Sequence, residues 1–196
     1  AVAIPVALGV VYWGGWALVA VVVAAAVLGA RELLGFGHRL GVTPLDRTAL
    51  LSSALLPVLV YLALTRYPAL VSAGWILAGL WLVLLLSLTL ARRAPGEHPL
   101  TATAVTAFAV LYPAGLASFL LSLRHLTYAE QSWAGAWLVF FPLVITWVCD
   151  TAAMFAGKAI GGPKLWPAIS PGKTWAGSIA GVIFAMAAVP LLNVIV

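Results

Sequence analysis

The composition excludes a soluble globular domain before any motif is considered. Of the 196 residues, 64% are hydrophobic and only 8% are charged, whereas soluble domains carry about 25% charged residues. The mean hydropathy of +1.14 predicts an all-α, polytopic integral membrane protein, a helical bundle of about seven transmembrane helices. The net charge is +5, but the cations lie in short loops between apolar runs, which favours lipid headgroups over nucleic acid as their partner.

The first apolar segment, residues 2–13, is shorter than the roughly 20 residues that cross a bilayer. Gly14 and Gly15 follow it and predict a tight turn into a second span. The next spans are expected at residues 15–34, 48–67, 70–90 and 101–123. We expect Gly35 and Gly37 to loosen the chain after the second span.

Prolines and loop residues add detail to the predicted spans. The loop at residues 41–47 contains Pro44 and Asp46 and is expected to cap the third span. Pro57 predicts a kink in that span, and Pro113 predicts a bend in the fifth. The leucine-rich end of the fourth span has no polar face, so we expect it to face lipid.

The two last spans are expected at residues 133–156 and 175–196. Counting Lys and Arg by alternate loops gives two on one side, Arg66 and Arg124. The other side has eight: Arg31, Arg39, Arg47, Arg92, Arg93, Lys158, Lys164 and Lys173. By the positive-inside rule, the basic loop at residues 157–174 is cytoplasmic.

Asp150 lies inside an apolar run, where a carboxylate is costly and marks a functional interior by default. Helical spacing puts it on one face with Met154, Gly157 and Lys158, roughly 12 Å from Lys158 along the axis. A carboxylate below a basic loop can hold a divalent cation against a phosphate. The alternative, an Asp–Lys pair that only fixes two helices together, stays open.

Polar residues beyond Asp150 suit an anionic ligand. Lys158, Lys164 and Lys173 can attract a nucleotide or an anionic lipid headgroup. Ser170 and Thr174 can donate to phosphate oxygens at the start of the last span, where free backbone amides also point. The sequence therefore predicts a phosphate-binding region between the two last spans.

Two segments resemble the phosphatidate cytidylyltransferase (CDP-diacylglycerol synthase) family: DTAAMFAGK at 150–158 and KLWPAISPGKTWAG at 164–177. They are similar to that family's D-T-x-A-Y-x-x-G-(R/K) and K-L-x-P-x-I-S-P-K-K-T-W-E-G patterns. The Gly-Gly-Trp at 14–16, the Arg-Glu at 31–32 and the segment 112–124 also resemble family spans. The resemblance covers the N-terminal two-thirds of such an enzyme.

The resemblance implies a membrane nucleotidyltransferase of phospholipid synthesis, in a bacterial inner (plasma) membrane. It would join CTP and phosphatidate to give CDP-diacylglycerol and pyrophosphate, with Mg²⁺ as cofactor. Its partners would be these substrates, membrane lipid and a second copy in a homodimer, with no nucleic acid. Carried over by position, the implied catalytic residues are Asp150 and Lys173, and Asp150 is also the implied metal ligand. The implied substrate-binding residues are Lys158, Lys164, Ser170 and Thr174.

Three positions depart from the family pattern: Ala176 stands for glutamate, Met154 for tyrosine and Ala152 for glycine. The family's later H-G-G and D-R-x-D signature would lie beyond Val196. We therefore expect residues 1–196 to be a single transmembrane domain that is incomplete at both ends. A non-catalytic membrane scaffold or an anionic-lipid-binding relative is the alternative, and a small transporter is a more distant one.

Overall fold

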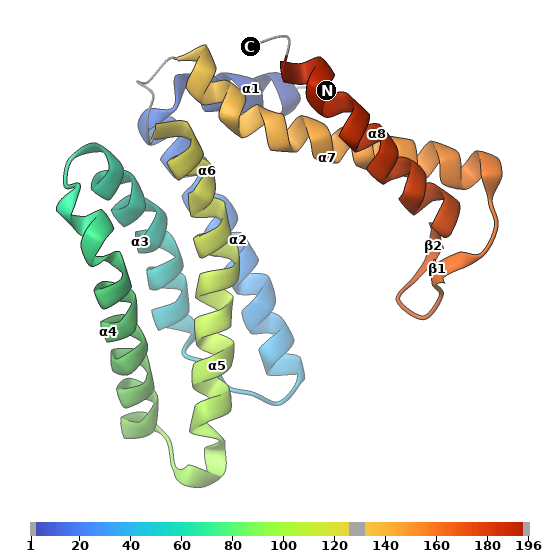
Figure 1. Cartoon of the computed structure of the whole chain (residues 1–196). Coiled ribbons are helices and arrows are strands. Elements are labelled where there is room, and N and C mark those ends of the chain that lie inside the picture. Colours follow the sequence, from blue (N-terminus) through green and yellow to red (C-terminus); the bar gives the residue numbers. More distant parts are fainter. Residues whose placement is uncertain (1–2, 126–131, 194–196) are drawn as a thin grey trace. The chain divides into compact units, whose positions relative to one another are not determined.

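The computed structural model describes residues 3–125 and 132–193 and shows an all-α fold with one short β-hairpin (Figure 1). Two compact units divide the chain, Ala1–Ala136 and Trp137–Val196. In the described ranges, six helices or helix runs are long and apolar enough to cross a membrane: Gly15–Arg39, Asp46–Thr65, Ala69–Arg92, Pro99–His125, Trp133–Ile160 and Trp175–Leu192. The polytopic helical membrane fold is thus confirmed, including its short first helix.

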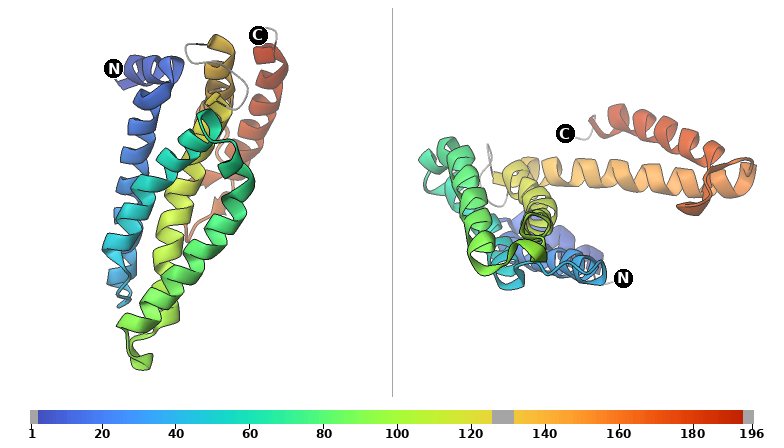
Figure 2. Two further views of the ribbon diagram at one scale, coloured as in Figure 1. Left: turned by 90° about the vertical axis from the view of Figure 1, so that its left-hand side faces the viewer. Right: turned by 90° about the horizontal axis from the view of Figure 1, so that it is seen from below.

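The part of the first unit that the structure describes is built from helices. They are α1 (Ala3–Trp13), α2 (Gly15–Arg39), α3 (Asp46–Thr65), α4 (Ala69–Arg92), η1 (Pro95–Glu97), α5 (Pro99–Val110), η2 (Leu111–Gly115) and α6 (Leu116–His125). The predicted limits of the third, fourth and fifth spans lie within two residues of the observed ones. Figure 2 shows α2, α3, α4 and α5 running lengthwise beside one another.

The core of the first unit is built around α2, which contacts α3, α5, η2 and α6. One residue per turn of α2 is buried along a single stripe: Leu18, Val22, Ala26, Ala30 and Leu34. The side chains of the two alanines in the middle of this stripe are small, which allows close helix packing in a membrane. By contrast, α4 buries only Leu85 and Thr89 among its described side chains, as its uniformly apolar sequence predicts for a lipid-facing helix.

The expected loosening at Gly35 and Gly37 is wrong, because α2 continues without a break to Arg39. Gly37 is buried, and a Cβ atom there would lie 2.7 Å from Cγ1 of Val105 on α5. The missing side chain therefore serves helix packing and not flexibility. The spacing of the glycines was visible in the sequence, but the neighbour that requires Gly37 was not.

The turn between α2 and α3 also differs from expectation. The residue before α3 is Leu45, which provides no side-chain cap. Its N–H donates instead to Oγ1 of Thr106 at 2.9 Å, and the carboxylate of Asp46 lies 3.0 Å from Nε2 of His38 at an exposed position. A residue on α5 thus satisfies a backbone donor that the local sequence was expected to satisfy.

The break expected at Pro113 takes the form of a π-helical turn, Leu111–Gly115. Proline lacks an N–H and disturbs the ladder of helical hydrogen bonds, which an extra residue in the turn accommodates. Pro113 packs against α2, since a Cβ atom on Gly29 would lie 2.8 Å from the Cβ of Pro113. Pro57 lies buried inside α3, which is continuous from Asp46 to Thr65.

The second unit holds most of α7 (Trp133–Ile160), the strands β1 (Lys164–Trp166) and β2 (Ser170–Thr174), and α8 (Trp175–Asn193). β1 and β2 form an antiparallel hairpin, which the all-α prediction did not include. The helices α7 and α8 approach closely where α8 carries glycine. A Cβ atom on Gly177 would lie 2.5 Å from the carbonyl oxygen of Ala153, and one on Gly181 would lie 2.9 Å from that of Cys149.

We expect Gly177→Ala to lower the free energy of unfolding by about 1–3 kcal/mol, since the added methyl group overpacks the interface between α7 and α8. The atom in its way is a backbone oxygen, which cannot rotate aside as a side chain can. SDS titration of the protein in mixed micelles measures this change.

Gly79→Ala is the matched control, because Gly79 lies inside α4 and its Cβ would meet nothing within 4 Å. Alanine is a better helix former than glycine, so this variant should be as stable as the parent or more so. Equal stability of the Gly177→Ala variant and the parent would contradict the close α7–α8 packing.

Candidate functional site

Asp150 lies on α7, ten residues before the helix ends at Ile160, which is roughly 15 Å along the axis. Its side chain is exposed in the second unit. It is next to the seam with α8, because Cys149 and Ala153 on the same helix contact Gly181. An exposed carboxylate at this depth is costly against lipid, so in a membrane this face of α7 requires polar groups, water or a cation.

The three lysines are exposed and come from different elements. Lys158 lies in the last turn of α7, Lys164 on β1 and Lys173 on β2. In the hairpin register Lys164 is opposite Thr174, the last residue of β2. The hairpin therefore brings Lys164 and Lys173, nine residues apart in sequence, to the same end of the second unit.

Thr174 has a structural contact that sequence reasoning did not assign. Its side chain is buried, and Oγ1 accepts a hydrogen bond from the N–H of Gly177 at 3.1 Å, which caps the start of α8. The same oxygen faces α7, since a Cβ atom on Gly157 would lie 3.0 Å from it. Thr174 thus ties the hairpin, α7 and α8 together, and its expected contact with a phosphate stays a prediction.

Ser170 is half-buried at the start of β2, opposite Trp166 on β1. After Asp150 the chain contains no Asp or Glu, while Lys158, Lys164 and Lys173 follow it. This end of the second unit is therefore positively charged and suits an anionic ligand.

A metal site made by the protein alone is not found in residues 3–125 and 132–193, which contain no group of three or more His, Cys, Asp or Glu side chains placed to hold an ion. Asp150 can still supply one carboxylate oxygen. Mg²⁺ is commonly bound through one or two carboxylates together with the phosphates of a substrate, so the donor present fits that arrangement.

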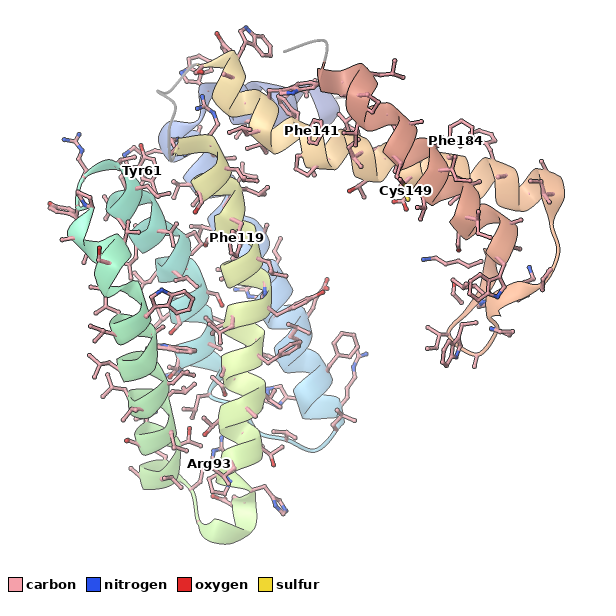
Figure 3. The ribbon with its side chains drawn as sticks, viewed as in Figure 1. Tyr61, Arg93, Phe119, Phe141, Cys149 and Phe184 are labelled. Carbon is pink, nitrogen blue, oxygen red and sulfur yellow. The ribbon has the colours of Figure 1, made fainter. Side chains whose placement is uncertain are left out.

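An apolar groove of about 600 Å³ lies along another face of the second unit. Its walls include Val144, Thr151 and Phe155 of α7 and Phe184 of α8, which Figure 3 labels. The lining is almost entirely hydrocarbon, so the groove suits an acyl chain and not a nucleotide.

A buried polar cluster in the first unit was missed by sequence reasoning. Arg124, counted as a loop cation, is fully buried at the end of α6. Its guanidinium donates from Nε to the carbonyl oxygen of Val11 and from a terminal nitrogen to that of Tyr12, each at 2.8 Å. A cation at the end of α1 both satisfies free carbonyls and complements the helix dipole.

His125 completes this cluster. The N–H of Gly15 donates to Nε2 at 3.0 Å, so Nε2 is unprotonated, and Nδ1 donates to the carbonyl oxygen of Leu121 at 3.1 Å. The ring also meets Tyr61 edge-on, with centroids 5.2 Å apart, at the end of α3 where Figure 3 labels Tyr61. These contacts join α2, α3 and α6. The only feature of the sequence that pointed to this cluster was the Gly-Gly turn at residues 14 and 15.

A comparison with protein families decides the family. The model of the cytidylyltransferase family matches residues 1–196, the whole of the chain. The chain belongs to the cytidylyltransferase family. The resemblance predicted from the segments at residues 150–158 and 164–177 is thereby confirmed.

Several curated relatives of this cytidylyltransferase-family chain are phosphatidate cytidylyltransferases. The chain is 34% identical to that of Haemophilus influenzae over 108 residues, 55% of this chain and 36% of the relative. It is 40% identical to that of Brucella suis over 77 residues, 39% of this chain and 27% of the relative. It is 44% identical to that of Rickettsia bellii over 59 residues, 30% of this chain and 26% of the relative. The matches thus span well under two thirds of each relative's length, and no solved structure matches the chain.

Proposed function

We propose that the protein takes part in transferring a cytidylyl group from CTP to phosphatidate, giving CDP-diacylglycerol and pyrophosphate. Membership of the cytidylyltransferase family supports nucleotidyl transfer, and the names of the relatives support this lipid acceptor. The observation that carries the proposal is the placement of Asp150 inside α7, beneath a hairpin that bears Lys164 and Lys173.

In this reaction a phosphate oxygen of phosphatidate attacks the α-phosphorus of CTP. A new P–O bond forms while the bond to the bridging oxygen breaks, and pyrophosphate leaves with that electron pair. Such a transfer between two polyanions depends on positioning and on neutralising charge. The three lysines of the second unit supply positive charge for both substrates: Lys158, Lys164 and Lys173. Ser170 and Thr174 supply hydroxyl groups on the same hairpin as two of these lysines.

Asp150 is the residue that would hold Mg²⁺, with the remaining ligands coming from substrate phosphates. The ion, when bound, would offset negative charge on the phosphates. In α7 the carboxylate lies about two turns from Lys158, and this helix packs closely against α8 at Gly177. A homodimer also stays a prediction.

Incorporation of radiolabelled CTP into lipid tests this function. Membranes that contain the natural protein should convert added phosphatidate to labelled CDP-diacylglycerol in a Mg²⁺-dependent manner, above membranes without it. Binding of phosphatidate without any labelled lipid product would favour a non-catalytic lipid-binding relative. Transport of a solute without lipid labelling would favour a transporter.

We also propose that the segment 157–174 faces the cytoplasm of a bacterial cell, on the strength of the eight-to-two distribution of basic residues. A cysteine at Gly162, which is exposed, in a Cys149→Ala background reports this directly. An impermeant maleimide should label it only after the cells are opened. Labelling from outside intact cells would contradict this orientation.

A further inference from the structure

The β1–β2 hairpin has an apolar tip. Residues 165–169, Leu-Trp-Pro-Ala-Ile, carry no charge, and Trp166 and Ile169 are 62% and 77% exposed. The N–H of Ile169 donates to the carbonyl oxygen of Trp166 at 3.2 Å, which closes the turn. Two large apolar side chains are therefore held outward by a defined turn at the end of a hairpin.

The connections of the hairpin keep it near the membrane surface. It joins two helices that are each apolar enough to span a bilayer, α7 ending at Ile160 and α8 beginning at Trp175. The N–H of Trp175 donates to the carbonyl oxygen of Pro163 at 3.1 Å, which closes the base of the hairpin. In Figure 1 the hairpin turns aside from the line of α7.

The lysines around the hairpin tip indicate which kind of surface the tip contacts. Lys164 and Lys173 flank it on the two strands, Lys158 lies at the end of α7, and all three are exposed. No Asp or Glu occurs among residues 151–196, so the chain itself does not neutralise them there. Lysines around exposed tryptophan and isoleucine match a bilayer surface, where the ammonium groups meet lipid phosphates and the apolar groups enter the interface.

We propose that residues 165–169 insert into the interface of an anionic bilayer, with Lys164 and Lys173 at the level of the headgroup phosphates. At about 3.3 Å per residue, the tip extends roughly 10 Å beyond Lys164. The layer between headgroup surface and hydrocarbon is about 5–8 Å thick on each side of a membrane. Trp166 and Ile169 therefore reach the edge of the hydrocarbon while the lysines remain outside it.

A single NBD fluorophore at Ile169→Cys, in a Cys149→Ala background, tests the insertion in the full chain reconstituted into vesicles. A single label is needed because the chain contains 9 tryptophans. In vesicles that contain phosphatidylglycerol, the label should emit at shorter wavelength than in water and be quenched by spin-labelled lipid. The measurement uses neither CTP nor a CTP-derived product, so its result is separate from cytidylyl transfer.

The same label at Gly162, exposed before the hairpin, is the matched control and should be quenched less by lipid and more by aqueous iodide. Lys164→Gln with Lys173→Gln should shift the insertion equilibrium toward water by roughly fivefold per lysine in anionic vesicles, and little in zwitterionic ones. A label at 169 that iodide quenches as freely as at 162 would overturn the proposal. So would a blue-shifted label that spin-labelled lipid does not quench, since the tip would then be covered by protein.

Discussion

Asp150→Asn should abolish the proposed cytidylyl transfer by the natural protein while leaving its amount in the membrane near normal. The amide keeps the volume of the side chain and removes its charge, so a role in binding Mg²⁺ is separated from packing. The exposed position of Asp150 on α7 means that no buried contact within the second unit is lost. Radiolabelled CTP incorporation, normalised to the protein present, measures the effect.

Asp46→Asn is the matched control, because Asp46 forms only an exposed pair with His38 among the contacts seen in the described residues. Exposed pairs contribute about 0–1 kcal/mol, so this variant should keep its activity. If Asp150→Asn retained more than about a tenth of the parental rate, the loss would be under about 1.4 kcal/mol. That result would exclude an essential metal-binding role.

Arg124→Met should lower the free energy of unfolding by about 3–5 kcal/mol, the largest stability effect expected in the first unit. Methionine fills much of the volume but leaves the carbonyl oxygens of Val11 and Tyr12 without the guanidinium that binds them. Because Arg124 is fully buried, no water replaces the lost donor. SDS titration in mixed micelles, followed by tryptophan fluorescence, measures the change.

The matched control is Arg66→Met, since Arg66 is an exposed cation just after α3. Its loss should change the free energy of unfolding by no more than about 0.5 kcal/mol. Equal effects of the two substitutions would mean that Arg124 acts only as an interfacial charge, as the loop count first assumed. Arg124→Lys should be intermediate, because one ammonium group cannot reproduce the planar fork.

The membrane spans were predictable from sequence because lipid imposes one requirement on every residue of a span. Each backbone polar group must be paired within the helix, and side chains must be apolar over roughly 20 residues. The predicted limits of the third, fourth and fifth spans are therefore close to those observed. Asp150 stood out for the same reason, as a charge where lipid disfavours one.

Residues whose role depends on a distant partner were not predictable. The sequence places Gly37 and Gly177 inside apolar runs, but only the fold brings Val105 and Ala153 against them. Arg124 looked like a loop cation because its acceptors lie more than a hundred residues earlier, on α1. Thr174 looked like a phosphate ligand, and the cap that it provides for α8 becomes visible only in three dimensions.

The sequence by itself thus determined the membrane class, the spans, the family and the region that bears Asp150 and the lysines, because hydropathy and motif are local properties of the chain. The tertiary structure alone decided which helices pack closely, which cation is buried and that β1 and β2 form a hairpin with an exposed apolar tip. Packing and burial depend on contacts between segments that are far apart in sequence, and no local pattern encodes the distances between them.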